Sequence, residues 1–127
     1  MLGAKEENGR VTAARIKFDR GFMLSVHLTF EFEGSGQGFG GWVLGGNPFD
    51  GALACQHATQ KNLAAEFIGG VMAVAGVEDW ADLRGTIMRV RREGDDGRIT
   101  SIGHAFKNMW FDPKARLGAL TGESEAA

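Results

Sequence analysis

Apolar and polar residues alternate along positions 22–32, and this alternation is the clearest structural signal in the chain. The apolar side chains occupy every second position: Phe22, Leu24, Val26, Leu28, Phe30 and Phe32. A period of two is typical of a β-strand with one buried face, so we predict a core strand here. The preceding stretch, Val11–Phe18, predicts a first strand. The connection Asp19-Arg20-Gly21 predicts a hairpin turn with Gly21 in the left-handed conformation.

The core strand runs directly into GSGQGFGGWVLGG, in which seven of the thirteen residues from Gly34 to Gly46 are glycine. Glycine permits sharp bends and close approach of the backbone to other groups. We therefore predict a loop over Gly34–Gly41. The apolar, glycine-bounded run Gly41–Gly45 predicts a third strand, and Asn47–Gly51 has the composition of a turn.

The hydrophobic period changes to that of a helix over Thr59–Ala75. Four apolar residues fall on one face, namely Leu63, Phe67, Val71 and Val74. Thr59 is a suitable N-cap, and Gly76 lies where a helix would end. Gly69 and Gly70 inside the helix each cost about 1 kcal/mol relative to alanine, which predicts close packing of the helix backbone on a sheet.

The last third of the chain returns to a strand pattern. Thr86–Arg92 alternates, with Met88 and Val90 predicted inward and Arg89 and Arg91 outward. Gly94-Asp95-Asp96-Gly97 predicts a hairpin turn, and its second strand begins at Arg98. Because Ile99, Ile102 and Phe106 do not keep one parity, we expect a bulge near 101–103 in that strand.

These elements predict an α+β fold of hairpin-connected strands and one main helix. The expected architecture is a twisted antiparallel sheet of about five strands packed on the helix, with a curl toward a half-barrel as a variant of it. Short helices are expected after Val77, with Trp80 and Leu83 inward, and from Asp112 to about Leu120. We expect a single domain over 11–120, with flexible tails at 1–10 and 121–127.

Composition narrows the class of protein. A chain of 127 residues with 43% hydrophobic residues is long enough for one core without a metal or disulfide, and Cys55 is its one cysteine. The polar start MLGAKEENGR has no secretory signal pattern, and no apolar run reaches the roughly 20 residues needed to span a membrane. We therefore expect a cytoplasmic protein without a membrane partner. The net charge of −2 confines any attraction to nucleic acid to local patches.

Candidate chemical motifs do not make a catalytic site. GSGQGFGG resembles a phosphate-binding loop, but neither Gly-Lys-Ser/Thr nor a helix follows it. Cys55 and His57 lack further zinc ligands and an orienting group for a nucleophile. Glu31 and Glu33 are assigned to a solvated strand face. We therefore predict no catalytic residues, no metal and no cofactor.

A basic patch on the last hairpin is a second candidate surface. Arg89, Arg91 and Arg92 lie beside Arg98 and Lys107, and acidic neighbours interrupt them. A solvated hairpin face is favoured over a nucleic-acid surface, although aromatic residues could offer stacking. We place the binding surface on the loop Gly34–Gly41, with Phe39 at its tip and the basic strand beside it. The predicted binding residues are Gly36, Gln37, Gly38, Phe39, Gly40, Gly41, Trp42, Arg89, Arg91 and His104.

Four segments, GSGQGFGGW, AAEFIGGVMAVAGVEDWADLRG, MRVRRE and IGHAFKNMWFDPK, resemble in order and spacing a family of small uncharacterised proteins encoded by bacteriophages and prophages. The resemblance covers roughly residues 12–115. It carries no known catalytic residue onto this chain. What it implies is a small phage accessory protein working in the host cytoplasm.

The sequence is compatible with three function classes. The leading hypothesis is a non-catalytic binding protein that inhibits a host defence system through protein–protein contact. The alternative is a binder of a small nucleotide or signalling molecule, or of single-stranded nucleic acid. A small hydrolase using His104 or the carboxylates is the third. We also expect a homodimer, because such a sheet has an open edge and Met23, Phe39 and Trp42 have no evident place in the core.

Overall fold

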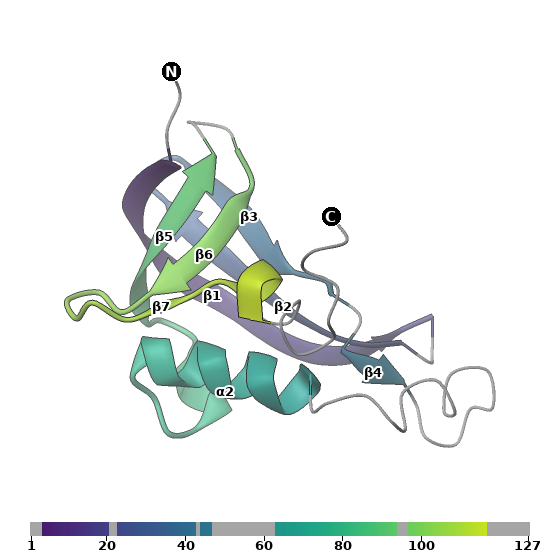
Figure 1. Ribbon diagram of the computed structural model, residues 1–127. Coiled ribbons are helices and arrows are strands. Elements are labelled where there is room, and N and C mark those ends of the chain that lie inside the picture. Colours follow the sequence, from purple (N-terminus) through teal and green to yellow (C-terminus); the bar gives the residue numbers. More distant parts are fainter. Residues whose placement is uncertain (1–3, 21–22, 43, 47–62, 94–96, 117–127) are drawn as a thin grey trace.

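The computed structural model describes residues 4–20, 23–42, 44–46, 63–93 and 97–116, which form an antiparallel sheet with a main helix against it (Figure 1). The strand order is β3-β2-β1-β5-β6-β7, and β4 pairs with the beginning of β2. The elements are β1 (Ala4–Asp19), β2 (Met23–Phe32), β3 (Ser35–Gly40), β4 (Gly45–Gly46), α2 (Leu63–Ala75), the 3-10 turn η1 (Trp80–Asp82), β5 (Ile87–Glu93), β6 (Ile99–Gly103) and β7 (Trp110–Phe111). The predicted α+β class is confirmed.

The hairpin of β1 and β2 forms as the alternation predicts. Asp19 pairs with Met23, and Val26, Leu28 and Phe30 are at most 1% exposed. The inward face of β2 is therefore confirmed. Arg20 has a φ of 55°, so a left-handed residue of this turn is an arginine, whereas Gly21 and Phe22 lie outside the described residues.

The predicted tail at 1–10 is wrong from Ala4 onward. β1 begins at Ala4, and Ala4–Arg10 pair with β5 while the second half of the strand pairs with β2. This first half has no apolar alternation, which is why the sequence did not predict it. Its partners include arginines of β5, and ion pairs of Glu6 and Glu7 with that strand accompany the backbone pairing.

The glycine-rich segment is a strand and not the predicted loop. Ser35–Gly40 is β3, in antiparallel register with β2 from His27 to Phe32. Gly40 has a φ of 126°, and a Cβ there would lie 2.1 Å from the carbonyl oxygen of Val26, so this close approach requires glycine. The third strand predicted at 41–45 is reduced to Gly45–Gly46, and the predicted turn at 47–51 lies outside the described residues.

Helix α2 buries the predicted face of Leu63, Phe67, Val71 and Val74. It ends at Ala75, and the next residue, Gly76, has a φ of 79°. Gly76 N donates to the carbonyl oxygens of Met72 and Ala73, and Val77 N donates to Met72 O. This Schellman pattern confirms Gly76 as the stop. The predicted N-cap, Thr59, lies outside the described residues.

In the last third, Met88 and Val90 of β5 are fully buried, as predicted. The bulge in β6 lies at Thr100, opposite Arg91 and Arg92, and so precedes the predicted place near 101–103. Because β6 ends at Gly103, Phe106 is in the connection to β7 and not in a strand.

Both predicted short helices begin as expected. Asp79 caps η1 by accepting from Ala81 N at 2.9 Å, and the following Leu83 is fully buried. The helix from Pro113 is capped by Asp112, which accepts from Ala115 N at 3.2 Å. Its predicted end near Leu120 and the tail at 121–127 lie outside the described residues.

The sheet curls, and α2 lies against it (Figure 1). Two strands that are well separated in the sheet order, β3 and β6, approach each other. Gln37 Nε2 on β3 donates a hydrogen bond to Gly97 O, just before β6, at 3.0 Å. Between sheet and helix is an aromatic cluster of Phe30, Phe39, Trp42, Phe67 and Phe111, with successive ring centroids 5.4–6.5 Å apart. This cluster is the centre of the core.

Candidate functional site

The residues predicted at the tip of a binding loop lie in the fold instead. Phe39 is 4% exposed, and its ring centroid is 6.0 Å from that of Phe67 in α2. Trp42 is partly buried and lies 5.7 Å from the same ring. The prediction of Phe39 as an exposed anchor is therefore wrong. Phe39 lies between two glycines of β3, and the pairing of β3 with β2 turns its ring inward. The sequence does not show that pairing.

Gln37 contacts a different arginine from those predicted beside the glycine segment. Arg92 Nη1 donates to Gln37 Oε1 at 2.7 Å, and Arg92 Nη2 lies 2.9 Å from Glu7 Oε2. Arg92 is only 9% exposed, and its guanidinium is 4.9 Å from the Phe32 ring. Arg92 continues the alternation of the inward residues Met88 and Val90. This alternation in the sequence could have predicted that its side chain points inward. The group of Glu7, Gln37 and Arg92 joins three strands where the sheet curls.

Arg89 and Arg91 point outward from β5, as predicted, and both guanidinium groups lie over the ring of Trp110 in β7. The guanidinium carbon of Arg91 is 3.7 Å from the Trp110 ring centroid, and that of Arg89 is 4.8 Å from it. Arg91 Nε also donates to Glu6 Oε2 at 3.0 Å. The structure thus brings the predicted basic pair together with an aromatic ring, that of Trp110.

The connection from His104 to Met109, which we call the Phe106 loop, is held by several hydrogen bonds. His104 Nδ1 accepts from Phe106 N at 3.0 Å and from Lys107 N at 3.1 Å. Arg89 donates to the carbonyl oxygens of His104 and Lys107, both at 2.8 Å. Because Nδ1 accepts two bonds, it carries no proton in this arrangement. His104 therefore holds the backbone of the Phe106 loop in place. Arg89, another predicted binding residue, bonds to the same loop.

Phe106 is the most exposed large apolar side chain among the described residues, at 90% exposure. It belongs to the Phe106 loop, together with Met109 at 39%. The sequence did not predict this exposure, because Phe106 was expected in a strand. The segment His104–Asn108 is mostly polar and has no strand alternation, and this pattern could have predicted a loop at Phe106.

A second cluster that the sequence analysis missed lies on the β1–β2 hairpin. Ser25 Oγ donates to Asp19 Oδ2 at 2.6 Å and lies 3.0 Å from His27 Nε2. The hydrogen bond from Ser25 is the main cause that holds the pKa of Asp19 below its ordinary value of 3.8, with Lys17 and His27 adding to it. Cross-strand pairing of Lys17 with Ser25 brings these residues to one face.

This serine, histidine and aspartate set does not have the geometry of a nucleophilic triad. In such a triad one imidazole nitrogen faces the serine and the other faces the carboxylate. Here Nε2 of His27 faces both, since it lies 3.5 Å from Asp19 Oδ2, and Ser25 is fully buried. The cluster stabilises the hairpin end and does not present a nucleophile to solvent.

Other candidate chemistry gains no support within the described part of the chain. No group of three His, Cys, Asp or Glu side chains there could hold a metal ion. Glu31 and Glu33 are exposed near the β2–β3 turn, while Cys55 and His57 lie outside the described residues. None of the described helices is long and apolar enough to cross a membrane.

Comparisons of the chain with protein-family models, curated proteins and solved structures found no match.

Proposed function

We propose that this protein acts by binding another protein, without catalysing a reaction, and that Phe106 is the anchor of the contact. The observation that carries this proposal is an aromatic side chain, 90% exposed, on a loop whose backbone is hydrogen-bonded to His104 and Arg89. A large rigid side chain entering a partner's pocket is a common hot spot in protein interfaces. An ordered loop also loses less conformational entropy on binding.

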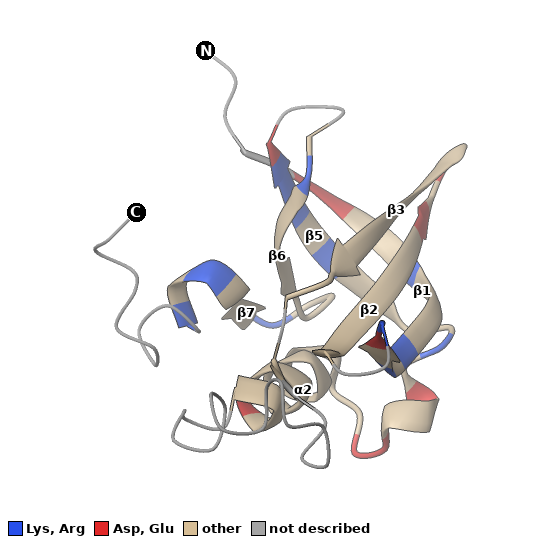
Figure 2. Cartoon of the chain, turned by 90° about the vertical axis from the view of Figure 1, so that its right-hand side faces the viewer, with Lys and Arg blue, Asp and Glu red and all other residues tan. Residues whose placement is uncertain are grey.

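The surroundings of Phe106 define the kind of partner that fits. Met109 adds apolar surface in the same loop, and Lys107 and the outer face of β5 supply positive charge (Figure 2). An apolar pocket rimmed by acidic side chains is complementary to this surface. The charge would contribute mainly to the association rate and to orientation, and Phe106 to the lifetime of the complex.

The class of partner follows from the sequence resemblance. A phage accessory protein working in the host cytoplasm would act on a host component, and the partner we propose is a protein of a host defence system. Two features of the structure support binding over catalysis: Ser25 is buried, and His104 Nδ1 is occupied by backbone donors. We further propose that the protein works as a homodimer.

The alternative function, binding of single-stranded nucleic acid on β5 and β7, has one observation in its favour. Arg89, Arg91 and Trp110 lie together and could contact a phosphate and a base. However, Arg91 already stacks on the ring and pairs with Glu6, so a base would have to displace an existing contact. The protein-binding proposal requires no such displacement.

The test is capture of partners from host lysate with immobilised wild-type protein and Phe106→Ala. A stoichiometric protein partner should be recovered by the wild type, and its affinity should fall about 10-fold or more in Phe106→Ala. The melting temperature should change by less than about 2 °C, because an exposed side chain adds little to stability. Phe106→Tyr keeps the ring and serves as the matched control.

Two outcomes contradict the proposal. One is the absence of any stoichiometric partner. The other is a partner that Phe106→Ala and Phe106→Tyr recover as well as the wild type does, which would place the contact elsewhere on the molecule.

A further inference from the structure

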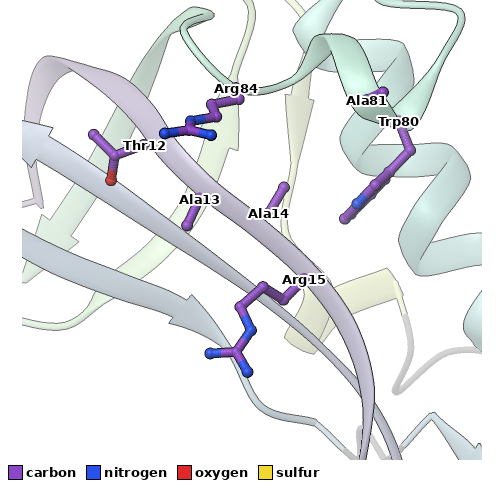
Figure 3. Close-up of a pocket in the computed structure, with 7 residues that line it drawn as sticks. All are labelled: Thr12, Ala13, Ala14, Arg15, Trp80, Ala81 and Arg84. Carbon is purple, nitrogen blue, oxygen red and sulfur yellow. The ribbon is translucent and has the colours of Figure 1, made fainter.

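A groove of about 430 Å³ separates β1 from the η1 turn (Figure 3). One wall is the β1 segment 12–15, and the other comes from η1 and the residues that follow it. Seven residues line it: Thr12, Ala13, Ala14, Arg15, Trp80, Ala81 and Arg84. Its volume is within the range of roughly 300–1,000 Å³ that small-molecule sites occupy.

Local backbone geometry makes this groove and fixes its walls. The register of β1 against β2 shifts between Val11 and Ala13, which leaves Thr12 as an extra residue at a bulge. Val11 N donates to Thr86 O at 2.9 Å, and Gly85 N donates to Val11 O at 2.6 Å. These two hydrogen bonds hold the segment after η1 against β1, beside the bulge. Ala13 and Ala14 have small side chains that point to opposite faces of β1, and Ala14 lies on the side of Trp80 (Figure 3).

Two arginines give the groove a positive character. Arg15 and Arg84 are exposed, and neither takes part in an ion pair or hydrogen bond with the described residues. By contrast, Arg89, Arg91, Arg92 and Arg116 each have an acidic or polar partner.

Acidic residues do not line the groove, but two lie on the adjacent turn. Asp79 uses its carboxylate to cap η1, and Asp82 is exposed. Figure 3 shows the guanidinium groups of Arg15 and Arg84 on either side of Ala13, with the Trp80 ring beyond Ala14. The groove lining thus contains two cations and, on the side of Ala14, a partly buried indole.

We propose that this groove binds a small phosphorylated molecule with a planar ring, of the nucleoside phosphate class. Guanidinium groups bind phosphate oxygens through paired, charge-assisted hydrogen bonds. Trp80 and the neighbouring Ala14 suit the planar ring, since base–aromatic stacking contributes about 1–3 kcal/mol. The site differs from the glycine segment and from the Phe106 loop, so the proposal is independent of the protein-binding function.

A single nucleotide fits better than a nucleic-acid strand. A strand needs a track of basic side chains that follows successive phosphates, and its binding then depends steeply on salt. Here the basic lining is limited to Arg15 and Arg84, one on each side of a short groove. The two sources of the same chemistry can be separated by comparing nucleotides with an oligonucleotide.

The experiment is isothermal titration calorimetry of the full chain with ADP, GDP, CDP and UDP, and with adenosine and inorganic phosphate as partial ligands. At least one diphosphate should bind, and both partial ligands should bind about 10-fold or more weakly. Arg84→Gln and Arg15→Gln should each weaken that binding about 10-fold or more. Arg98→Gln, an exposed arginine outside the groove, is the matched control and should bind as the wild type does.

Trp80→Phe supplies a second readout. Ligand binding should quench tryptophan fluorescence in the wild type and lose most of that quenching in Trp80→Phe. Circular dichroism melting checks that each variant is folded, and the two arginine variants keep the proposal testable if Trp80→Phe is unstable.

Three results would overturn the proposal. The first is no binding of any of the four diphosphates at concentrations up to about 5 mM. The second is binding that Arg84→Gln and Arg15→Gln leave unchanged. The third is a single-stranded oligonucleotide of about eight nucleotides that binds more tightly than every mononucleotide, which would assign the groove to nucleic acid.

Discussion

At the scale of single residues, Phe39 separates the sequence-based prediction from the structure. Its ring lies among Phe30, Trp42 and Phe67 and is 4% exposed. We expect Phe39→Ala to destabilise the protein by about 3–5 kcal/mol, because it removes a buried aromatic ring and leaves a cavity. Thermal unfolding followed by circular dichroism should show a melting temperature lower by at least several degrees.

Phe106→Ala is the matched control for this change, since it removes the same ring from an exposed position. An equal, small effect of both substitutions would show that Phe39 is not part of the core. Loss of partner binding by Phe39→Ala at an unchanged melting temperature would restore the original view of Phe39 as an exposed anchor.

At the scale of elements, the two glycines of α2 have different surroundings. A Cβ on Gly70 would lie 2.6 Å from the Phe111 ring of β7, whereas a Cβ on Gly69 would meet no heavy atom within 4 Å beyond its chain neighbours and the backbone of its own helix. We expect Gly70→Ala to destabilise the protein by about 1–3 kcal/mol through overpacking. Gly69→Ala should stabilise it by about 0.5–1 kcal/mol, because alanine favours a helix over glycine. Chemical denaturation of the two variants measures both free energies of unfolding.

Because both changes add one methyl group to adjacent positions, each is the control for the other. Stabilisation by both substitutions would mean that α2 does not lie against β7 as closely as the structure has it. The sequence predicted close packing of the helix backbone at both glycines. In the structure only Gly70 is closely packed, against the Phe111 ring.

At the scale of the whole molecule, the prediction of a homodimer now depends on different residues. Phe39 and Trp42 contribute to the core, so they no longer argue for a second copy. Ile16 and Phe18 are 44% and 45% exposed, and they pair across the hairpin with Val26 and Leu24. We expect these two side chains to be covered in a dimer, because neighbouring apolar side chains on a strand favour association.

Light scattering at micromolar concentration should therefore give twice the mass of the 13.6 kDa chain. Phe18→Ser should shift the mass toward that of one chain, while Phe106→Ser, on the loop between β6 and β7, should leave it doubled. A wild-type mass of 13.6 kDa would exclude the dimer under these conditions.

Local periodicity in the sequence was enough to predict the inward face of β2, the buried face of α2 and the inward Met88 and Val90 of β5, and the glycine at position 76 was enough to predict where α2 stops. These features depend on residues a few positions apart, whose geometry a strand or helix dictates. The sequence also supplied the α+β class and the outward direction of Arg89 and Arg91.

The tertiary structure alone decided the features that depend on partners distant in the chain. The polar first half of β1 became a strand because β5 lies beside it, and the glycine segment became β3 because β2 offers it an edge. Arg92 found its partners Glu7 and Gln37 on two other strands, and the groove of Arg15 and Arg84 formed where the bulge in β1 meets the segment after η1. Such contacts depend on how the sheet curls, and alternation along one strand carries no information about which other strand will lie next to it.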